Sequence, residues 1–142
     1  MILIEWMYEL DSNYLHGKIP DEIGALKYLE KLQFGSNSLD GTLPSTIGKL
    51  ESLQVLHIGD NSLTGSIPTE LGDLTSLHII SLYENHFTGF IPSEFVNLKE
   101  LKGLFLSDND ISGDLHEFCL SNNLVIQVDC RKIEKCQCCV CK

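Results

Sequence analysis

A single period of 24 residues runs through most of this sequence and constrains its fold more than any other feature. Asparagine recurs at this interval, and glycine follows four residues later each time. The asparagines are Asn13, Asn37, Asn61, Asn85 and Asn109, and the glycines are Gly17, Gly41, Gly65, Gly89 and Gly113. A period of this length is typical of a repeat protein, in which each unit buries its apolar face only against its neighbours.

Two apolar residues, separated by one position, precede each asparagine. These pairs are Tyr8/Leu10, Leu32/Phe34, Leu56/Ile58, Ile80/Leu82 and Leu104/Leu106. Side chains two positions apart lie on one face of a strand, so each pair predicts a short strand with its apolar side inward. Stacked coils then place the strands side by side in a parallel sheet. The asparagine amide is expected to satisfy backbone groups at the turn, and the glycine suits an unusual φ or a close approach.

The repeat LxxLxLxxNxLxGxIPxxLGxL resembles the plant-type leucine-rich repeat, and its fullest copy is LQVLHIGDNSLTGSIPTELGDL at residues 53–74. The resemblance implies an α/β repeat solenoid, a right-handed coil with a parallel β-sheet on its concave side and short strands and 3-10 turns on its convex side. Members of the family include receptor-like-kinase ectodomains, polygalacturonase inhibitors and stand-alone secreted proteins. The cysteine-rich ending is most similar to stand-alone algal proteins of this class.

The pattern predicts a degenerate N-terminal half-coil at residues 1–7, about five repeats at residues 8–118 and a cysteine-rich cap at residues 119–142. Residues 124–130 could add one last strand. Plant-type relatives usually start with paired cysteines, whereas no cysteine precedes Cys119 and no signal peptide is recognisable. We therefore expect a fragment of a longer secreted or cell-surface protein. The alternative is a short protein whose first coil is capped by Ile2, Ile4, Trp6 and Met7.

The charge balance and the missing motifs narrow the function. With 20 acidic and 10 basic residues, the formal net charge is −10, so nucleic acid and anionic membrane surfaces are poor partners. A surplus of carboxylates that only maintains solubility is the alternative. No apolar run approaches the ~18 residues that span a bilayer. No catalytic motif occurs, and the histidines fall at solvent-facing positions, so we predict a non-enzyme without a cofactor or metal.

Strand geometry predicts where a partner would bind. The residues that alternate with the inward pairs face the concave surface, where His57, Tyr83 and Phe105 fall in neighbouring units. An acidic column at the strand ends could attract a basic peptide. The predicted partner-binding residues are Lys31, Gln33, His57, Asp60, Ile79, Ser81, Tyr83, Glu84, Phe105 and Asp108. Aromatic residues among polar neighbours are typical anchors of a binding patch, although a solenoid also exposes such a face without binding anything.

These observations predict a secreted or cell-surface module that recognises an extracellular protein, peptide or cell-wall glycan on its concave face. The alternative is a scaffold protein that self-associates through an uncapped N-terminal edge, because an open sheet edge invites pairing.

All six cysteines lie in the C-terminal segment. They are Cys119, Cys130, Cys136, Cys138, Cys139 and Cys141. Cys119 is in phase with inward apolar positions and Cys130 is in phase with Leu106, so we predict a Cys119–Cys130 disulfide that holds the cap. The other four are also expected in disulfides, with a metal cluster or reactive thiols as alternatives. Disulfides indicate a compartment outside the reducing cytosol.

Overall fold

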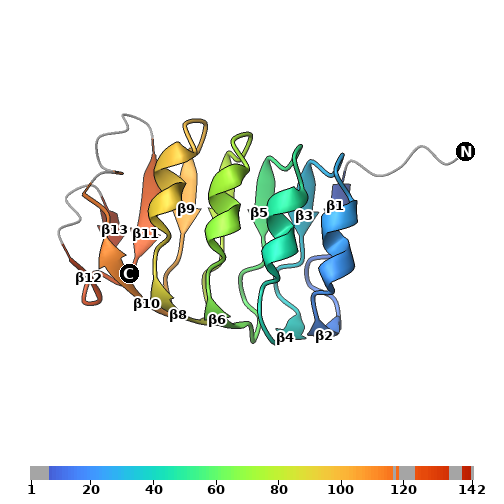
Figure 1. Ribbon diagram of the computed structural model, residues 1–142. Helices are drawn as coiled ribbons and strands as arrows, with labels where there is room; N and C mark the ends of the chain where they lie inside the picture. The colour runs from blue at the N-terminus through green and yellow to red at the C-terminus, as the bar shows by residue number, and fades with distance from the viewer. Residues whose placement is uncertain (1–6, 117, 119–123, 135–138, 142) are drawn as a thin grey trace, which may run out of the picture.

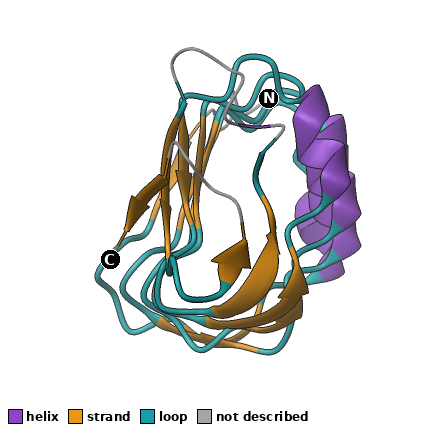
Figure 2. Cartoon of the chain, turned by 90° about the vertical axis from the view of Figure 1, so that its left-hand side faces the viewer, coloured by secondary structure: helices purple, strands orange, loops and turns teal. Residues whose placement is uncertain are grey.

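The structure is a computed structural model that describes residues 7–116, 118, 124–134 and 139–141. In it the chain forms a solenoid whose coils stack from the N-terminal to the C-terminal end (Figure 1). Viewed along the stack, the main-sheet strands lie on one side and the short helices lie on the opposite side (Figure 2). The predicted repeat solenoid is confirmed.

The main sheet is parallel, with seven strands in the order β1-β3-β5-β7-β9-β11-β13. They are β1 (Met7–Glu9), β3 (Lys31–Gln33), β5 (Val55–His57), β7 (Ile79–Ser81), β9 (Gly103–Phe105), β11 (Val125–Val128) and β13 (Cys139–Cys141). The register places Leu32 beside Leu56 and Leu56 beside Ile80, as the 24-residue period predicts. The strand expected within residues 124–130 is β11.

Smaller parallel sheets join the two sides of the coil. One pairs β2 (His16–Lys18) with β4 (Ser38–Asp40), and the other contains β6 (Thr64–Ser66), β8 (His86–Phe90), β10 (Asp110–Asp114) and β12 (Ile133–Glu134). The convex side carries the 3-10 helices η1 (Asp21–Ala25), η2 (Ser45–Lys49), η3 (Thr69–Asp73) and η4 (Ser93–Asn97). Each follows a proline, whose fixed φ and missing N–H suit the extended residue before a helix. Within the described ranges, none of the helices is long or apolar enough to cross a membrane.

The core consists of stacked leucine and isoleucine columns between the main sheet and the helices. Leu56, Ile80 and Leu104 lie side by side in successive strands, and each is 0% exposed. Complete burial of one such side chain stabilises the fold by about 1.5–3 kcal/mol. Because each coil contributes only one layer, most of this burial comes from contacts between coils.

The repeated asparagines form the ladder that their spacing predicts. The Nδ2 of Asn85 donates to the carbonyl oxygen of Ile58 in the preceding coil (3.0 Å) and to that of Leu82 (3.2 Å). Its Oδ1 accepts from the backbone N–H of Leu63 (2.9 Å). The glycine four residues after each asparagine has a positive φ, for example +80° at Gly65, a conformation that costs glycine little.

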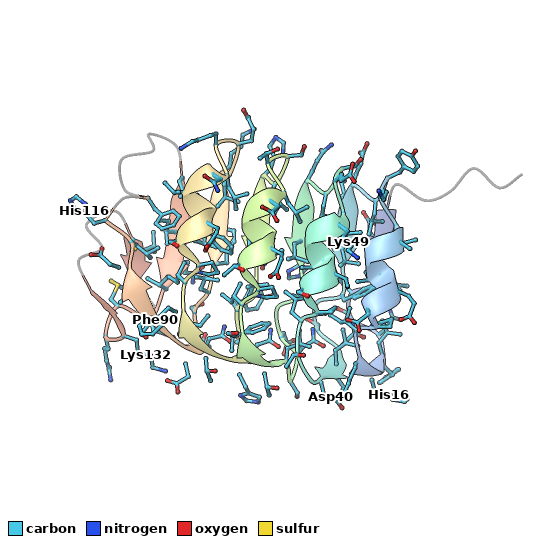
Figure 3. The ribbon with its side chains drawn as sticks, viewed as in Figure 1. His16, Asp40, Lys49, Phe90, His116 and Lys132 are labelled. Atoms are coloured by element: carbon cyan, nitrogen blue, oxygen red, sulfur yellow. A yellow bond between two sulfur atoms is a disulfide. The ribbon has the colours of Figure 1, made fainter. Side chains whose placement is uncertain are left out.

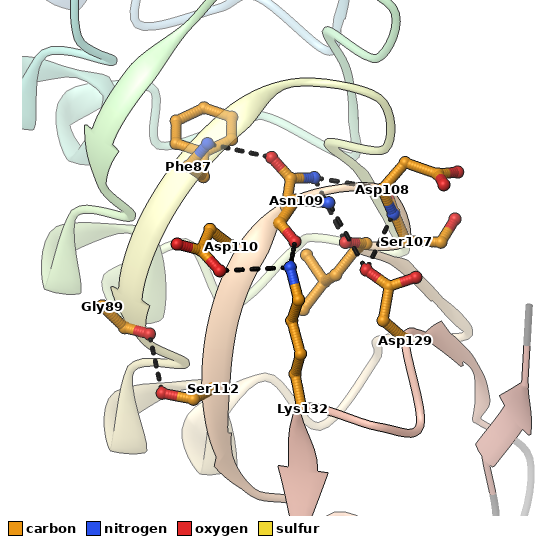
Figure 4. A network of polar contacts seen from close by, with 10 residues as sticks. Phe87, Gly89, Ser107, Asp108, Asn109, Asp110, Ser112, Asp129 and Lys132 are labelled. Atoms are coloured by element: carbon orange, nitrogen blue, oxygen red, sulfur yellow. Dashed lines mark hydrogen bonds and ion pairs between the residues drawn. The ribbon is translucent and has the colours of Figure 1, made fainter.

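Two charged side chains end this ladder at the C-terminal coil (Figure 4). In the inner coils a backbone carbonyl of the next coil accepts from the turn, as when Ser107 accepts from the N–H of Glu84 (2.9 Å). In the last turn, Oδ2 of Asp129 accepts from the N–H of Asp108 instead (3.0 Å). The Nζ of Lys132 donates to the carbonyl oxygen of Asn109 (2.7 Å). Asp129 therefore replaces a contact that a further coil would supply, and Lys132 adds a bond to the last asparagine of the ladder.

The predicted Cys119–Cys130 disulfide is wrong. Cys130 is bonded to Cys141, with their Cα atoms 5.3 Å apart. The reason is the register of the last coil, which pairs Phe105 with Gln127 and so brings Val128, not Cys130, into line with Leu106. Cys130 lies beyond the end of β11, next to the end of the neighbouring strand β13.

The remaining cysteines are only partly described. Cys139 is also disulfide-bonded, so Cys130, Cys139 and Cys141 do not offer thiolates to a metal. Cys119, Cys136 and Cys138 lie outside the described residues.

Candidate ligand-binding face

The outward side of the main sheet carries most of the predicted binding residues in two lateral columns. The first column is Lys31, Val55, Ile79, Gly103 and Val125, and the second is Gln33, His57, Ser81, Phe105, Gln127 and Val140. Both columns are in register from strand to strand because alternate residues of each strand face the same side. The predicted residues on β3 to β9 are therefore neighbours in space, while their role in binding stays a prediction.

The aromatic side chains lie along the sheet. The ring of Tyr83 stacks on the ring of His57, with centroids 5.8 Å apart and an interplanar angle of 29°. His57 in turn contacts Ser81, with 3.0 Å between Nδ1 and Oγ. A Cβ at Gly59 would come within 2.6 Å of the Tyr83 ring, and one at Gly103 within 2.7 Å of the Phe105 ring. These glycines thus leave the space that the two rings occupy.

A groove of about 320 Å³ opens between the coils of β7 and β9. It is lined by Ser81, Tyr83, Glu84, Phe105, Ser107 and Gln127. Four of these residues belong to the predicted set, and Ser107 and Gln127 do not. Gln127 lies on the last strand expected at residues 124–130, but the predicted binding residues end with the repeats. The available signal was its place between the apolar residues Ile126 and Val128, which puts its side chain on the outward face of that strand.

The C-terminal half of the face exposes apolar side chains. Ile79 is 37% exposed, Val125 is 51% exposed and Val140 is 57% exposed. Ile79 and Val125 lie on either side of Gly103 in the first column, and Val140 lies next to Gln127 in the second. The sequence prediction included Ile79 only, because it placed no binding residues beyond β9.

The predicted acidic residues at the strand ends do not all lie at the groove. Asp60, Glu84 and Asp108 are exposed and have left-handed φ values of 56°, 49° and 57°. Ser12 and Ser36 share this conformation, so it belongs to the turn of every coil. Glu84 lines the groove, whereas Asp108 lines a separate hollow of about 700 Å³. That hollow also contains Asp129, Arg131 and Lys132.

Two predicted residues lie towards the N-terminal end, away from the groove. Lys31 and Gln33 are both on β3, and the Nε2 of Gln33 is 3.4 Å from Oδ2 of Asp11. The structure therefore gathers Ser81, Tyr83, Glu84 and Phe105 at one groove and places His57 against Tyr83.

The stacked strands, the asparagine ladder and the open concave sheet define the class as a leucine-rich repeat solenoid. The model of the leucine-rich repeat region family matches residues 9–134, and the chain belongs to this family. No curated protein matches the chain in a sequence comparison.

Several solved structures are similar to the chain. It is 32% identical to the plant peptide hormone receptor RGFR1, solved in complex with RGF2, with a TM-score of 0.82 over 87% of this chain and 21% of that one. It is 36% identical to the ectodomain of the Arabidopsis thaliana membrane receptor kinase GASSHO1/SCHENGEN3, solved in complex with CASPARIAN STRIP INTEGRITY FACTOR 2. That match has a TM-score of 0.74 and covers 80% of this chain and 14% of the receptor chain. A plant ice-binding protein is 37% identical to the chain, with a TM-score of 0.72. The match covers 81% of this chain and 37% of the ice-binding protein. The chain thus spans well under half of each of these proteins.

Proposed function

We propose that this chain is a non-catalytic recognition module that binds an extracellular peptide or protein on its concave face. The observation that carries the proposal is the groove beside the exposed side chains of Ile79, Val125 and Val140. Exposed apolar side chains grouped on one face are typical of interaction sites. The solved relatives support the same function, since two of them are plant receptors described in complex with ligands.

An extracellular location fits both the chemistry and the relatives. The Cys130–Cys141 disulfide is of a kind that persists in oxidising compartments. The ectodomain of GASSHO1/SCHENGEN3 belongs to a membrane receptor kinase. We therefore place the proposed binding event outside the cell.

A displayed library of random peptides tests the concave face. The full chain would be compared with a double variant, Ile79→Asp with Val125→Asp, in which two charges disrupt the apolar part of the face. Val96→Asp is the matched control, because Val96 is 39% exposed on the convex helix η4. We expect peptides selected on the unchanged chain to lose binding to the double variant and to keep binding to the control.

Equal binding of the selected peptides to all three proteins would contradict the proposed face. Circular dichroism and thermal unfolding would confirm that the variants are folded. A glycan array probed with the same proteins tests the other ligand class, and binding to glycans alone would replace the peptide with a polysaccharide.

Self-association is the second candidate function, and the edge of the main sheet favours it. Within the described residues, β1 pairs on one side only, with β3. A second copy could add a strand to such an edge. Sedimentation velocity over a range of protein concentrations separates the two functions. We expect a mass independent of concentration for a recognition module, whereas growth with concentration would favour the scaffold.

A further inference from the structure

We propose that the groove between Tyr83 and Phe105 is a subsite for a cationic side chain, an arginine or a lysine of the ligand. The inference rests on the proposed function and names the chemistry of one contact on that face. Six residues line the groove, and they include two aromatic rings and one carboxylate.

The strand register fixes the layout of the groove. Phe105 on β9 lies between Ser81 on β7 and Gln127 on β11 in the second column. Tyr83 and Ser107 follow these strands in neighbouring coils, and the N–H of Glu84 donates to the carbonyl of Ser107 (2.9 Å). Ser81 is 6% exposed and Ser107 is 2% exposed, so they form the floor. The half-buried rings of Tyr83 and Phe105 form the walls.

The walls and the rim both attract positive charge. The face of an aromatic ring attracts a cation that lies within about 6 Å of its centre, and guanidinium groups also stack on such rings. The Glu84 carboxylate at the rim adds an opposite charge. The rings are also held in place, because Tyr83 stacks on His57 and Phe105 lies over Gly103.

The floor supplies hydrogen-bond acceptors. An ammonium or guanidinium group only donates, so it needs oxygen atoms around it. Ser107 lines the groove, and its hydroxyl oxygen can accept a hydrogen bond. Gln127 also lines the groove, and its side-chain amide oxygen can accept a further hydrogen bond. A donor-rich group from a ligand would satisfy these oxygens.

Other ligand groups fit this set of residues poorly. An anion would meet Glu84 without a basic residue, because none of the six lining residues is basic. The nearby Lys132 already donates to the Asn109 carbonyl and contacts Asp110 (3.1 Å). A purely apolar side chain would remove water from Glu84, Ser107 and Gln127 without replacing its hydrogen bonds, which is unfavourable.

Nuclear magnetic resonance titration of the full chain tests the subsite with small probes. The probes are Nα-acetyl-arginine amide, Nα-acetyl-lysine amide and Nα-acetyl-citrulline amide, the last being a neutral analogue of arginine with nearly the same shape. We expect saturable shifts of backbone amides in residues 81–84 and 105–107 and at Gln127 with the arginine or the lysine probe. We expect the citrulline probe to bind about tenfold more weakly or not at all. Equal shifts with citrulline, or no shifts at these amides with either cation, would overturn the proposal.

Variants separate the two attractive features. Glu84→Gln removes the rim charge, and Phe105→Leu removes a ring while keeping an apolar side chain. We expect each to weaken binding of the better cationic probe about three- to tenfold. Phe90→Leu and Glu94→Gln are the controls, since Phe90 is 73% exposed on β8, outside the main sheet (Figure 3), and Glu94 lies on the convex helix η4. Unchanged affinity in both groove variants would refute the assignment.

The outcome for this subsite is distinguishable from the outcome for the proposed function. If the concave double variant abolishes peptide selection but the cationic probes leave the groove amides unchanged, the recognition function stands and the subsite fails. If the probes occupy the groove but no peptide or protein binds the face, the subsite stands and the proposed function fails.

Discussion

At the scale of single residues, the buried asparagines contribute more to the fold than their polarity suggests. Each side chain makes hydrogen bonds to two coils, so one amide replaces contacts that turns would otherwise leave unmade. Two glycines of the concave face also have a specific role, because Gly59 and Gly103 leave the space that the rings of Tyr83 and Phe105 occupy. The periodic asparagines therefore stabilise the coils, while Gly59 and Gly103, which lie outside the glycine column of the repeat, leave space in the candidate site.

Replacing Asn85 tests this view of the ladder. Asn85→Ala leaves the N–H of Leu63 and the carbonyl of Ile58 without their partner, and each unsatisfied buried group costs about 1–3 kcal/mol. We expect the free energy of unfolding, measured by urea denaturation, to fall by about 2–5 kcal/mol. Asn97→Ala at the exposed end of η4 is the control and should change it by less than about 0.5 kcal/mol. Similar losses in both variants would contradict the ladder.

At the scale of the structural element, the last turn depends on Asp129. Asp129→Ala removes the carboxylate that accepts from the N–H groups of Asp108 (3.0 Å) and Asn109 (3.5 Å). Because coils contact only their neighbours, we expect faster hydrogen exchange at these two amides and little change before β7. Asp73→Ala on the exposed side of η3 is the matched control. Faster exchange throughout the chain, or none at the two amides, would argue against local capping.

The Cys130–Cys141 disulfide is a second feature that stabilises the C-terminal coils. Replacing Cys130 and Cys141 together with serine opens a bond between residues separated by 11 positions. In the chain-entropy model such a bond stabilises by roughly 3 kcal/mol. We expect hydrogen exchange to become faster in β11 and β13, with β1 to β7 unaffected. Unchanged protection of β13 would show that strand pairing alone holds it.

The regular coils could be predicted from the sequence, whereas the structure of the C-terminal cap could not. The main-sheet strands and the ladder could be predicted because one period fixes the position of every column, and the convex short strands and 3-10 turns were implied by the family resemblance. The period gives no guidance after Gly113, because β11 pairs Ile126 with Leu104 and β13 pairs Cys139 with Ile126, at spacings of 22 and 13 residues. The cap formed by Asp129 and Lys132, the cysteine pairing and the place of Gln127 in the groove all depend on that change of register. Four groove residues could still be predicted because they lie on regular coils.

At the scale of the whole molecule, the net charge of −10 acts on any ligand before contact. An excess of negative charge attracts a positively charged partner during diffusion. Salt screens this attraction, with a screening length of about 10 Å at 0.1 M ionic strength and about 3 Å at 1 M. If the ligand carries the cation proposed for the groove, its association rate should depend on salt more strongly than its dissociation rate, because the aromatic contacts act only after binding.

Surface plasmon resonance with an arginine-containing peptide selected on the unchanged chain tests this long-range effect. We expect the association rate to fall at least about tenfold between low and high salt, while the dissociation rate changes much less. The same peptide with citrulline in place of arginine should associate at a rate that salt hardly changes. Equal salt dependence for the two peptides would show that the acidic surface serves solubility and does not guide a cationic ligand to the concave face.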